Sequence, residues 1–525
     1  MDASLSDLLP VAASRRPSTI ALCDDLGGEL TYSELNDRVI RSRAIIQDSG
    51  LGTGDRIVLD VERSCESVVA IHAAIAAGCV VVPVSDGSQS GIQYDALNWL
   101  APSAVIGPRA TQIMENIQGQ HTISATSLSA LSKGPNRPMK RKPPEHATKI
   151  AYIVLTSGST GTPRCIVGAH AAALFCVEEI NHALGNKDDD VILCGLPLSF
   201  DYGFYQIFLA VAAMCTLRLT NIFENPLGLP RLANQACATA LPATPGLIRA
   251  MNKSHLWHRL DSRRLRYVCS TGDYLTQSDI SSLSEALPYT SVVPMYGLSE
   301  CKRVAISPPG NGTRAEGGVG YPLPGTETKL NDCFAIGGRT VGELHVAGPH
   351  LMPGYWHADG ITDAGRYYSD ANGKRWLRTG DVFEIKGDGY LIFVDRMDAI
   401  IKVGDAKYSL FDAERELKVV KGVSSVILAC FDANGAPSNE APEKIVAFVV
   451  ADRSRSLTVE KIARDLLAFA VERDIGLVPD EFCFVDRIPL NERGKIDRNR
   501  LSAGYPSVPE KYAAPAGRRV PPSQR

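Results

Sequence analysis

Metal-binding and redox cysteine patterns are missing from this 525-residue sequence. Its 13 cysteines form no C-x-x-C pair and show no spacing typical of metal ligands, which gives no support for a zinc module or a dithiol redox site. Cys79, Cys215, Cys269 and Cys430 lie in apolar surroundings. We expect them to be reduced core residues of a cytoplasmic protein.

A large excess of charge of either sign is also lacking. Lys and Arg number 55 and Asp and Glu 58, giving a formal net charge of −3. No basic stripe alternates with aromatic residues, so we expect neither nucleic acid nor a membrane as a partner. The N-terminus lacks the basic-then-apolar layout of a signal peptide. The longest apolar stretch, residues 67–84, contains His72 and ends in a β-branched run, which predicts a buried helix leading into a strand.

The length predicts at least two domains. Helical and β-branched apolar segments alternate from about residue 30 to 390, which indicates an α/β architecture with largely parallel sheets. A compact stretch with its own strand and helix pattern follows Asp395, so we place a domain boundary there. We therefore expect domains at 1–395 and 396–503. The tail 504–525, heavy in Pro, Ala and Arg, is expected to be disordered.

A loop rich in hydroxyl groups is the most informative feature. The apolar run 150–155 leads into Thr-Ser-Gly-Ser-Thr-Gly-Thr-Pro-Arg at 156–164. Glycine allows close approach of the backbone, while amide and hydroxyl groups donate to phosphate oxygens. The alternative is a polar surface turn. Pro163 stands where the common nucleotide-triphosphatase loop needs glycine, which excludes that motif. The candidate phosphate-binding residues are Thr156, Ser157, Gly158, Ser159, Thr160, Gly161 and Arg164.

This loop resembles the phosphate loop of the AMP-forming adenylating superfamily, which includes acyl-CoA synthetases, luciferases and adenylation domains of nonribosomal peptide synthetases. Further motifs follow in the family's order, so the resemblance extends from about residue 15 to about residue 502. It implies a large N-terminal domain of stacked sheets flanked by helices and a small mobile α+β lid. It also implies ATP and Mg²⁺ as cofactors and conversion of a carboxylic acid to acyl-AMP.

The stretch Tyr296-Gly297-Leu298-Ser299-Glu300 resembles the family's Y-G-x-T-E motif. The resemblance implies that the Tyr296 ring lies against adenine, that Ser299 meets the α-phosphate and that Glu300 helps to hold magnesium. These roles suit a flat ring, a neutral donor and a hard oxygen ligand. Read in isolation, the same stretch is a turn. Two other sets follow from the resemblance: Gly272, Asp273 and Tyr274 beside the adenine, and Thr271, Gly297 and Leu298 at the substrate.

Three motifs implied by the resemblance lie nearer the C-terminus. Asp381 ends an R-T-G-D segment whose carboxylate accepts hydrogen bonds from the ribose hydroxyls. Arg396 and Asp398 match the hinge between the two domains, and Arg396 is expected to reach the nucleotide. Lys495 lies in the P-x-x-x-x-G-K-[IV]-x-R signature. A mobile cation there would stabilise charge as the acid attacks the α-phosphate; in isolation it would be a solvated surface lysine.

Two departures from the family bear on the chemistry. Arg164 replaces the usual lysine of the phosphate loop, which keeps the charge and changes its geometry. Asp405 stands where ligases that form thioesters commonly carry glycine, and an anion there puts thioester formation in doubt. The alternative is a shift of one residue, with Gly404 taking the glycine position.

Asp201 marks the expected substrate pocket, within Leu-Pro-Leu-Ser-Phe-Asp-Tyr-Gly-Phe-Tyr at 196–205. It could be a helix N-cap, a ligand for an ammonium group on the acid, or a base that accepts a proton from an attacking amine. The last role resembles the ATP-dependent amide bond synthetases of the marinacarboline type. The predicted pocket residues here are Pro197, Phe200, Asp201, Tyr202 and Phe204.

The sequence therefore predicts an amide bond synthetase that joins a carboxylic acid to an amine. We expect the acid to be aromatic, because the residues around Asp201 are rich in Phe and Tyr. Lys495, Glu300 and Asp201 are the predicted catalytic residues. The alternative is a stand-alone ligase that loads CoA or a carrier protein. A catalytically inactive nucleotide-binding scaffold is disfavoured because Lys495, Glu300 and Asp381 are all present.

Overall fold

The structure is a computed structural model. It describes residues 4–85, 91–117, 124–126, 149–157, 163–221, 225–310, 315–403, 406–439, 442–452, 457–473, 475–489, 496–505, 508 and 510–513. The chain divides into two compact units. The first unit comprises Met1–Thr328 and Val346–Leu377, and the second comprises Lys329–His345 and Arg378–Arg525. Among the described residues, no helix is both long and apolar enough to cross a membrane.

One sheet of the first unit has a parallel centre. Strands β1, β10, β9, β11, β12 and β13 lie side by side in this order, all parallel. Strand β2 pairs antiparallel with β1, and β14 pairs antiparallel with both β13 and β15. Strands β11 and β12 are buried along their whole length, as expected for a sheet covered on both faces. The strands are β1 (Ile20–Cys23), β2 (Glu29–Thr31), β9 (Val191–Cys194), β10 (Thr216–Leu219), β11 (Ala240–Ala243), β12 (Tyr267–Ser270), β13 (Ser291–Tyr296), β14 (Ala305–Ile306) and β15 (Gly318–Pro322).

The other sheet of this unit also has a parallel centre, β6-β5-β3-β4-β7, with β8, β18 and β19 added antiparallel. The helix-to-strand prediction for residues 67–84 is confirmed by α3 (Cys65–Ala76) and β4 (Val80–Val84). The remaining strands are β3 (Arg56–Asp60), β5 (Ala104–Ile106), β6 (Ser124–Thr126), β7 (Ile150–Ser157), β8 (Pro163–Ala169), β18 (Gly354–His357) and β19 (Gly360–Thr362). Strand β20 (Tyr367–Ser369) does not belong to this sheet and pairs antiparallel with residues 375–377 of β21 (Arg375–Ile385).

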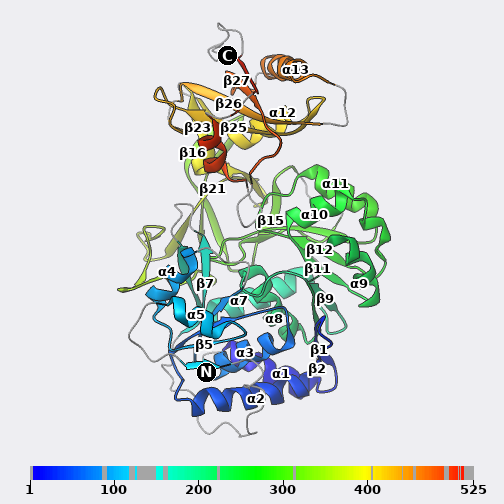
Figure 1. Ribbon diagram of the computed structural model, residues 1–525, viewed down its shortest axis with the longest axis vertical. Helices are drawn as coiled ribbons and strands as arrows, with labels where there is room; N and C mark the ends of the chain where they lie inside the picture. Colours follow the sequence, from blue (N-terminus) through cyan, green and yellow to red (C-terminus); the bar gives the residue numbers. More distant parts are fainter. Residues whose placement is uncertain are drawn as a thin grey trace. The chain divides into compact units, whose positions relative to one another are not determined.

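Helices pack on these sheets through apolar faces. Ile248 of α10 and Leu283 of α11 join Leu241, Val268 and Val292 of three neighbouring strands in one buried core, and Figure 1 shows α9, α10 and α11 gathered alongside β11 and β12. The helices are α1 (Leu8–Arg15), α2 (Tyr32–Asp48), α4 (Gly91–Leu100), α5 (Ala110–Asn116), α7 (His170–Leu184), α8 (Asp201–Ala213), α9 (Leu229–Gln235), α10 (Pro245–Lys253) and α11 (Gln277–Ala286). The mixed α/β class is confirmed.

The second unit has a separate core. Strands β25 and β26 are antiparallel, β27 is parallel to β26, and helices α12 and α13 share their apolar cluster; Figure 1 shows both helices beside these strands. The elements are β16 (Glu327–Ile336), β17 (Arg339–Ala347), β21 (Arg375–Ile385), β22 (Leu391–Arg396), β23 (Ile400–Val403), β24 (Ala406–Ser409), α12 (Leu410–Leu417), β25 (Val423–Phe431), β26 (Lys444–Ala451), α13 (Val459–Glu472), β27 (Glu481–Phe484), α14 (Arg498–Gly504) and β28 (Glu510–Ala513).

The compact units divide the chain at different places from the predicted domains. The second unit begins its main segment at Arg378 and also contains Lys329–His345, because β16, β17, β21 and β22 form one sheet. The hinge boundary near residue 396 stays a prediction. Part of the tail expected to be disordered is a strand: Glu510–Ala513 pairs antiparallel with β27, and the Tyr512 ring packs edge-on against Phe484. For these residues the expectation of disorder is wrong.

Candidate active site

The ends of parallel strands bring the predicted first-unit residues to one edge of a sheet. Asp201 follows β9, residues 271–274 follow β12, and residues 297–300 follow β13. Strands β11, β12 and β13 are parallel neighbours in register, and β9 pairs with β11. In open α/β sheets, ligands bind outside the carboxyl ends of such strands. The topology therefore gathers these side chains into one candidate site.

The predicted phosphate loop connects two antiparallel strands. Thr156 pairs with Arg164 and Ser157 with Pro163, so β7 and β8 close the two ends of the loop. Gly158, Ser159, Thr160 and Gly161 lie outside the described residues. The Arg164 guanidinium carbon lies 5.5 Å from the ring centre of Tyr355, a distance at which a cation is attracted to a ring face.

A tight turn follows β13 because the chain must return at once into β14. A Cβ atom on Gly297 would lie 2.1 Å from the Lys302 carbonyl oxygen, so only glycine fits this position. The turn closes with a 2.9 Å hydrogen bond from the Val304 amide to the Tyr296 carbonyl. Lys302 has φ = 58°, a left-handed conformation that is uncommon for a side chain of this size.

Asp201 is the first residue of α8 and forms an ion pair. The N-cap of α8 is Phe200, which makes no side-chain capping bond, so the N-cap interpretation of Asp201 is wrong. Instead, Asp201 Oδ2 lies 3.2 Å from Lys302 Nζ, whose side chain is only 2% exposed. Burial raises the pKa of Asp201, but the charge of Lys302 and a hydrogen bond from Ser299 outweigh it, so the pKa lies below its usual value. Asp201 is therefore an anion at neutral pH.

Most of the aromatic residues around Asp201 belong to the core. Phe204 is fully buried. The Tyr202 hydroxyl donates to the Cys269 carbonyl at 3.0 Å, and the hydroxyls of Tyr205 and Tyr152 lie 2.7 Å apart. These rings are held within the protein by their own partners. Phe200 is half-buried, and its ring lies 3.9 Å from where a Cβ atom on Gly272 would be.

The turn after β12 is held by ionic and hydrogen-bonding contacts. Thr271 Oγ1 accepts a 2.7 Å hydrogen bond from Arg303 Nη1. Asp273 pairs with Arg249 at 3.2 Å, and the Tyr274 hydroxyl donates to the carboxylate of Glu316. Gly272 has φ = 97°, a backbone conformation that residues other than glycine rarely adopt.

Glu300, the predicted magnesium ligand, is buried and already has two partners. Its Oε1 atom accepts hydrogen bonds from the Tyr355 hydroxyl at 2.6 Å and from Arg366 Nη1 at 2.7 Å. Mg²⁺ on a nucleotide needs only one or two protein carboxylates, because phosphates and water supply the other oxygens. The second carboxylate oxygen of Glu300 suits this role. Among the described residues, no group of three or more acidic, His or Cys side chains could hold a metal by itself.

The second unit holds the predicted ribose and hinge residues. Asp381 is buried in β21, and its Oδ1 lies 3.2 Å from Arg396 Nη1 on the paired strand β22. The Nε atom of Arg396 lies 3.4 Å from Asp398 Oδ1, so the arginine bridges two carboxylates. Gly380, with φ = 73°, donates its amide to Glu343 at 2.9 Å. Lys495, Gly404 and Asp405 lie outside the described residues.

Similarity to known proteins identifies the family of this chain. A family model described as "AMP-binding enzyme" matches residues 9–356. The chain belongs to the AMP-binding enzyme family. The family's description indicates that this AMP-binding enzyme binds an adenosine nucleotide. The resemblance seen in the sequence is confirmed.

Relatives cover nearly the whole chain. Phenyloxazoline synthase MbtB of Mycobacterium sp. (strain MCS) is 27% identical over 96% of this chain, which spans 42% of the length of that relative. ATP-bound MatB from Rhodopseudomonas palustris superposes with a TM-score of 0.81, covering 95% of this chain and 99% of that one at 21% identity. VinN in complex with L-aspartate has a TM-score of 0.65 and 28% identity, covering 75% of this chain and 98% of that one. These matches confirm the adenylating-enzyme fold.

Three site residues of this AMP-binding enzyme were not predicted. Lys302 and Arg303 follow Glu300 after one intervening residue, Cys301, and a Lys-Arg pair ahead of the apolar run 304–306 was the available signal. Arg366 became visible only through its contact with Glu300, 66 residues earlier.

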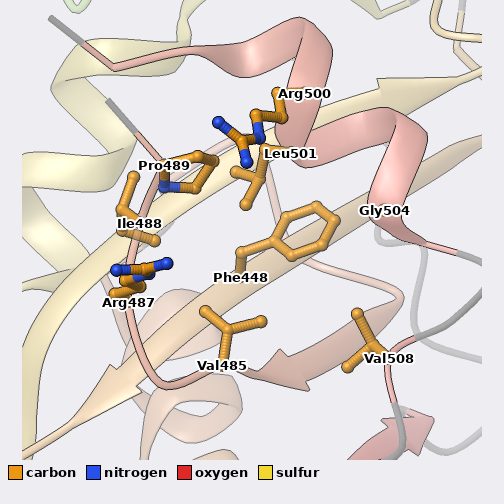
Figure 2. Close-up of a pocket in the computed structure, with 9 residues that line it drawn as sticks. All are labelled: Phe448, Val485, Arg487, Ile488, Pro489, Arg500, Leu501, Gly504 and Val508. Carbon is orange, nitrogen blue, oxygen red and sulfur yellow. The ribbon is translucent and has the colours of Figure 1, made fainter. Parts of the chain in front are cut away.

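A cavity of about 530 Å³ lies in the second unit of the enzyme and is lined by none of the predicted site residues. Figure 2 shows the apolar side chains of Phe448, Val485 and Leu501 pointing toward one another, with Arg487 and Arg500 at the margin. Nothing in its lining links it to the chemistry of the candidate site.

Proposed function

We propose that this enzyme activates a carboxylic acid that also bears an amino group, converting it with MgATP to an acyl-adenylate and pyrophosphate. The observation that carries the proposal is the ionised carboxylate of Asp201 at the carboxyl ends of the strands. An aspartate with one oxygen held by Lys302 keeps acceptor capacity for an ammonium group. The complex of VinN, a relative, with L-aspartate supports an amino acid as the substrate.

The other roles follow the family motifs. Thr156–Gly161 and Arg164 bind the phosphates, Tyr296 and residues 272–274 hold adenine, and Asp381 accepts hydrogen bonds from the ribose. Lys495 stabilises the charge that builds as the carboxylate attacks the α-phosphate. Glu300 would hold the magnesium ion, which would supply positive charge next to the phosphates.

The acyl acceptor is either an amine, which gives an amide, or a thiol of CoA or a carrier protein. Amide formation would use Asp201 as the base. A base works best when its pKa lies near the working pH, whereas the charge of Lys302 keeps the pKa of Asp201 low. This contact favours ammonium binding over proton abstraction. The buried state of Tyr202 and Phe204 likewise gives little support for an aromatic acid.

Exchange of labelled pyrophosphate into ATP tests the proposal. Acids are offered as matched pairs with and without an amino group, such as alanine with propionate and anthranilate with benzoate. We expect exchange with amino acids. Asp201→Asn should lower kcat/KM for them about 100-fold, the effect of removing one partner of a buried charge pair. Asp190→Asn is the control, because Asp190 is a buried, Arg-paired carboxylate elsewhere in the same sheet.

Two results would contradict the binding of a substrate ammonium group by Asp201. If acids without an amino group exchange better and Asp201→Asn changes nothing, ammonium binding is wrong. If Asp201→Asn leaves exchange intact but abolishes amide formation from a supplied amine, Asp201 is the base and the enzyme is an amide bond synthetase. Supplying CoA in a parallel reaction and analysing for thioester identifies the other acceptor.

A further inference from the structure

Two successive cationic residues are buried beside the candidate substrate site. Lys302 and Arg303 are each only 4% exposed. They follow Glu300 in the turn between β13 and β14, where the left-handed conformation of Lys302 and the close packing of Gly297 fix the path of the chain. Burying a charge is costly unless a partner of opposite sign compensates it. The positions of their partners therefore decide what this pair does.

The two cations face a single acidic group. Lys302 Nζ pairs with Asp201 Oδ2 at 3.2 Å. Among the described residues, Arg303 forms no ion pair with any carboxylate. Its Nη1 donates to Thr271, its guanidinium carbon lies 5.6 Å from the Tyr202 ring centre, and its buried Nε has no hydrogen-bond partner. Within the described part of the chain, Lys302 and Arg303 therefore share one carboxylate, Asp201, whose pKa the charge of Arg303 also lowers, so one positive charge is in excess.

The excess positive charge lies next to the expected substrate. Each of the two cations contacts a residue predicted to bind the acid, Lys302 through Asp201 and Arg303 through Thr271. The Lys302 ammonium also lies 4.1 Å from the ring centre of Tyr205. A small cavity of about 10 Å³ borders both cations and the rings of Tyr202 and Tyr205. An arginine with a free Nε–H suits a carboxylate, which accepts two hydrogen bonds from the guanidinium.

We propose that the acid activated by this enzyme carries a second anionic group, a carboxylate, which binds at Lys302 and Arg303 while the first carboxylate is adenylated. The inference rests on the adenylation step of the proposed function. It applies to an acidic amino acid and, if the ammonium-binding part of that proposal fails, to a dicarboxylic acid. Their shared chemistry is the second carboxylate. Asp201 distinguishes the two kinds of substrate. It would bind the ammonium group of an acidic amino acid, whereas it would make no favourable contact with a dicarboxylic acid that has no amino group.

Pyrophosphate exchange with charged and neutral analogues of equal size tests the inference. The pairs are aspartate with asparagine, glutamate with glutamine, and succinate with succinamate. We expect the diacid of at least one pair to be preferred. Arg303→Gln and Lys302→Met should each lower kcat/KM for that diacid about 100-fold, chiefly through KM, with less than a tenfold effect on the neutral partner. Arg303→Lys, which keeps the charge, should restore part of the loss.

Controls separate this role from a structural one. Arg266→Gln removes an arginine of the same sheet whose partner is Asp190, outside the site, and should leave the acid preference unchanged. Binding of AMP and tryptophan fluorescence show whether each variant is folded. A preference for neutral acids in the wild type, or equal losses for charged and neutral acids in the Arg303 variants, overturns the inference while adenylation stands. If no acid in any panel supports exchange, the proposed function itself fails.

Discussion

At the scale of single residues, the site combines groups that the sequence identifies with groups that only folding brings together. Asp201 was found from its motif, but its role depends on Lys302, which lies 101 positions later by the residue numbers. That lysine reaches Asp201 because the chain takes a left-handed turn at Lys302 itself. Sequence patterns do not specify such a turn for lysine, because the conformation is set by the surrounding packing.

Gly297→Ala tests this turn. The added methyl group would overlap the Lys302 carbonyl at 2.1 Å and push the Lys302–Arg303 segment away from Asp201. We expect the first unit to lose about 2 kcal/mol of its free energy of unfolding, the usual effect of overpacking, and pyrophosphate exchange to fall with it. All four tryptophans belong to the first unit, so urea unfolding followed by tryptophan fluorescence measures this directly.

Gly310→Ala is the matched control for that substitution. A Cβ atom on Gly310 would meet nothing within 4 Å, so the free energy of unfolding should stay within about 0.5 kcal/mol of the wild type. Equal stability of the two variants would show that the turn tolerates a side chain at Gly297. The close approach to Lys302 would then not matter for the site.

At the scale of elements, strands and helices were predictable where burial is periodic and local. The helix and the strand predicted for residues 67–84 are confirmed, because long apolar and β-branched runs bury their side chains without help from a particular partner. Strand β28 was missed since its residues are short of apolar side chains, and its order comes from pairing with β27. Turns and loops depend on distant contacts, and residues 158–162 of the phosphate loop lie outside the described residues.

Arg498 shows how a signature residue outside the chemistry acts through an element. It follows Lys495 by three positions and begins α14. Its two terminal nitrogens bind both carboxylate oxygens of Glu414 in α12, at 2.6 and 2.9 Å, and Nη1 also donates to the Leu428 carbonyl. This forked contact fixes the C-terminal end of the segment that bears Lys495 to the core of the second unit.

Arg498→Lys should therefore weaken the second unit and the reaction together. Lysine keeps the charge but cannot make the two parallel hydrogen bonds, so we expect a loss of about 2 kcal/mol and a lower rate of adenylation. Hydrogen exchange of the β25 and β26 amides measures the stability of this unit, and pyrophosphate exchange measures activity. Arg500→Lys, on the same helix, is the control. Unchanged amide protection in Arg498→Lys would show that the fork does not hold the segment.

At the scale of the whole molecule, the chain consists of two compact units that each have their own core. The predicted residues are shared between them: Asp201, Tyr296 and Glu300 belong to the first, and Asp381 and Lys495 to the second. The proposed function therefore assigns residues of both units to the reaction. The family resemblance implies the expectation that the small domain rotates between the half-reactions, with different residues serving each step.

Lys495→Ala tests this division of labour. The lysine is assigned to the first half-reaction, where charge builds on the bridging oxygens, so its loss should slow adenylation about 100- to 1000-fold. Product formation from preformed acyl-adenylate and the acceptor should change less than tenfold, because that step begins after pyrophosphate has left. Lys461→Ala is the control, since Lys461 lies in the same unit and its ammonium group pairs, among the described residues, with Asp465 on the surface of α13. Equal losses in the two half-reactions would mean that Lys495 supports the protein as a whole and would remove the reason to assign it to one step.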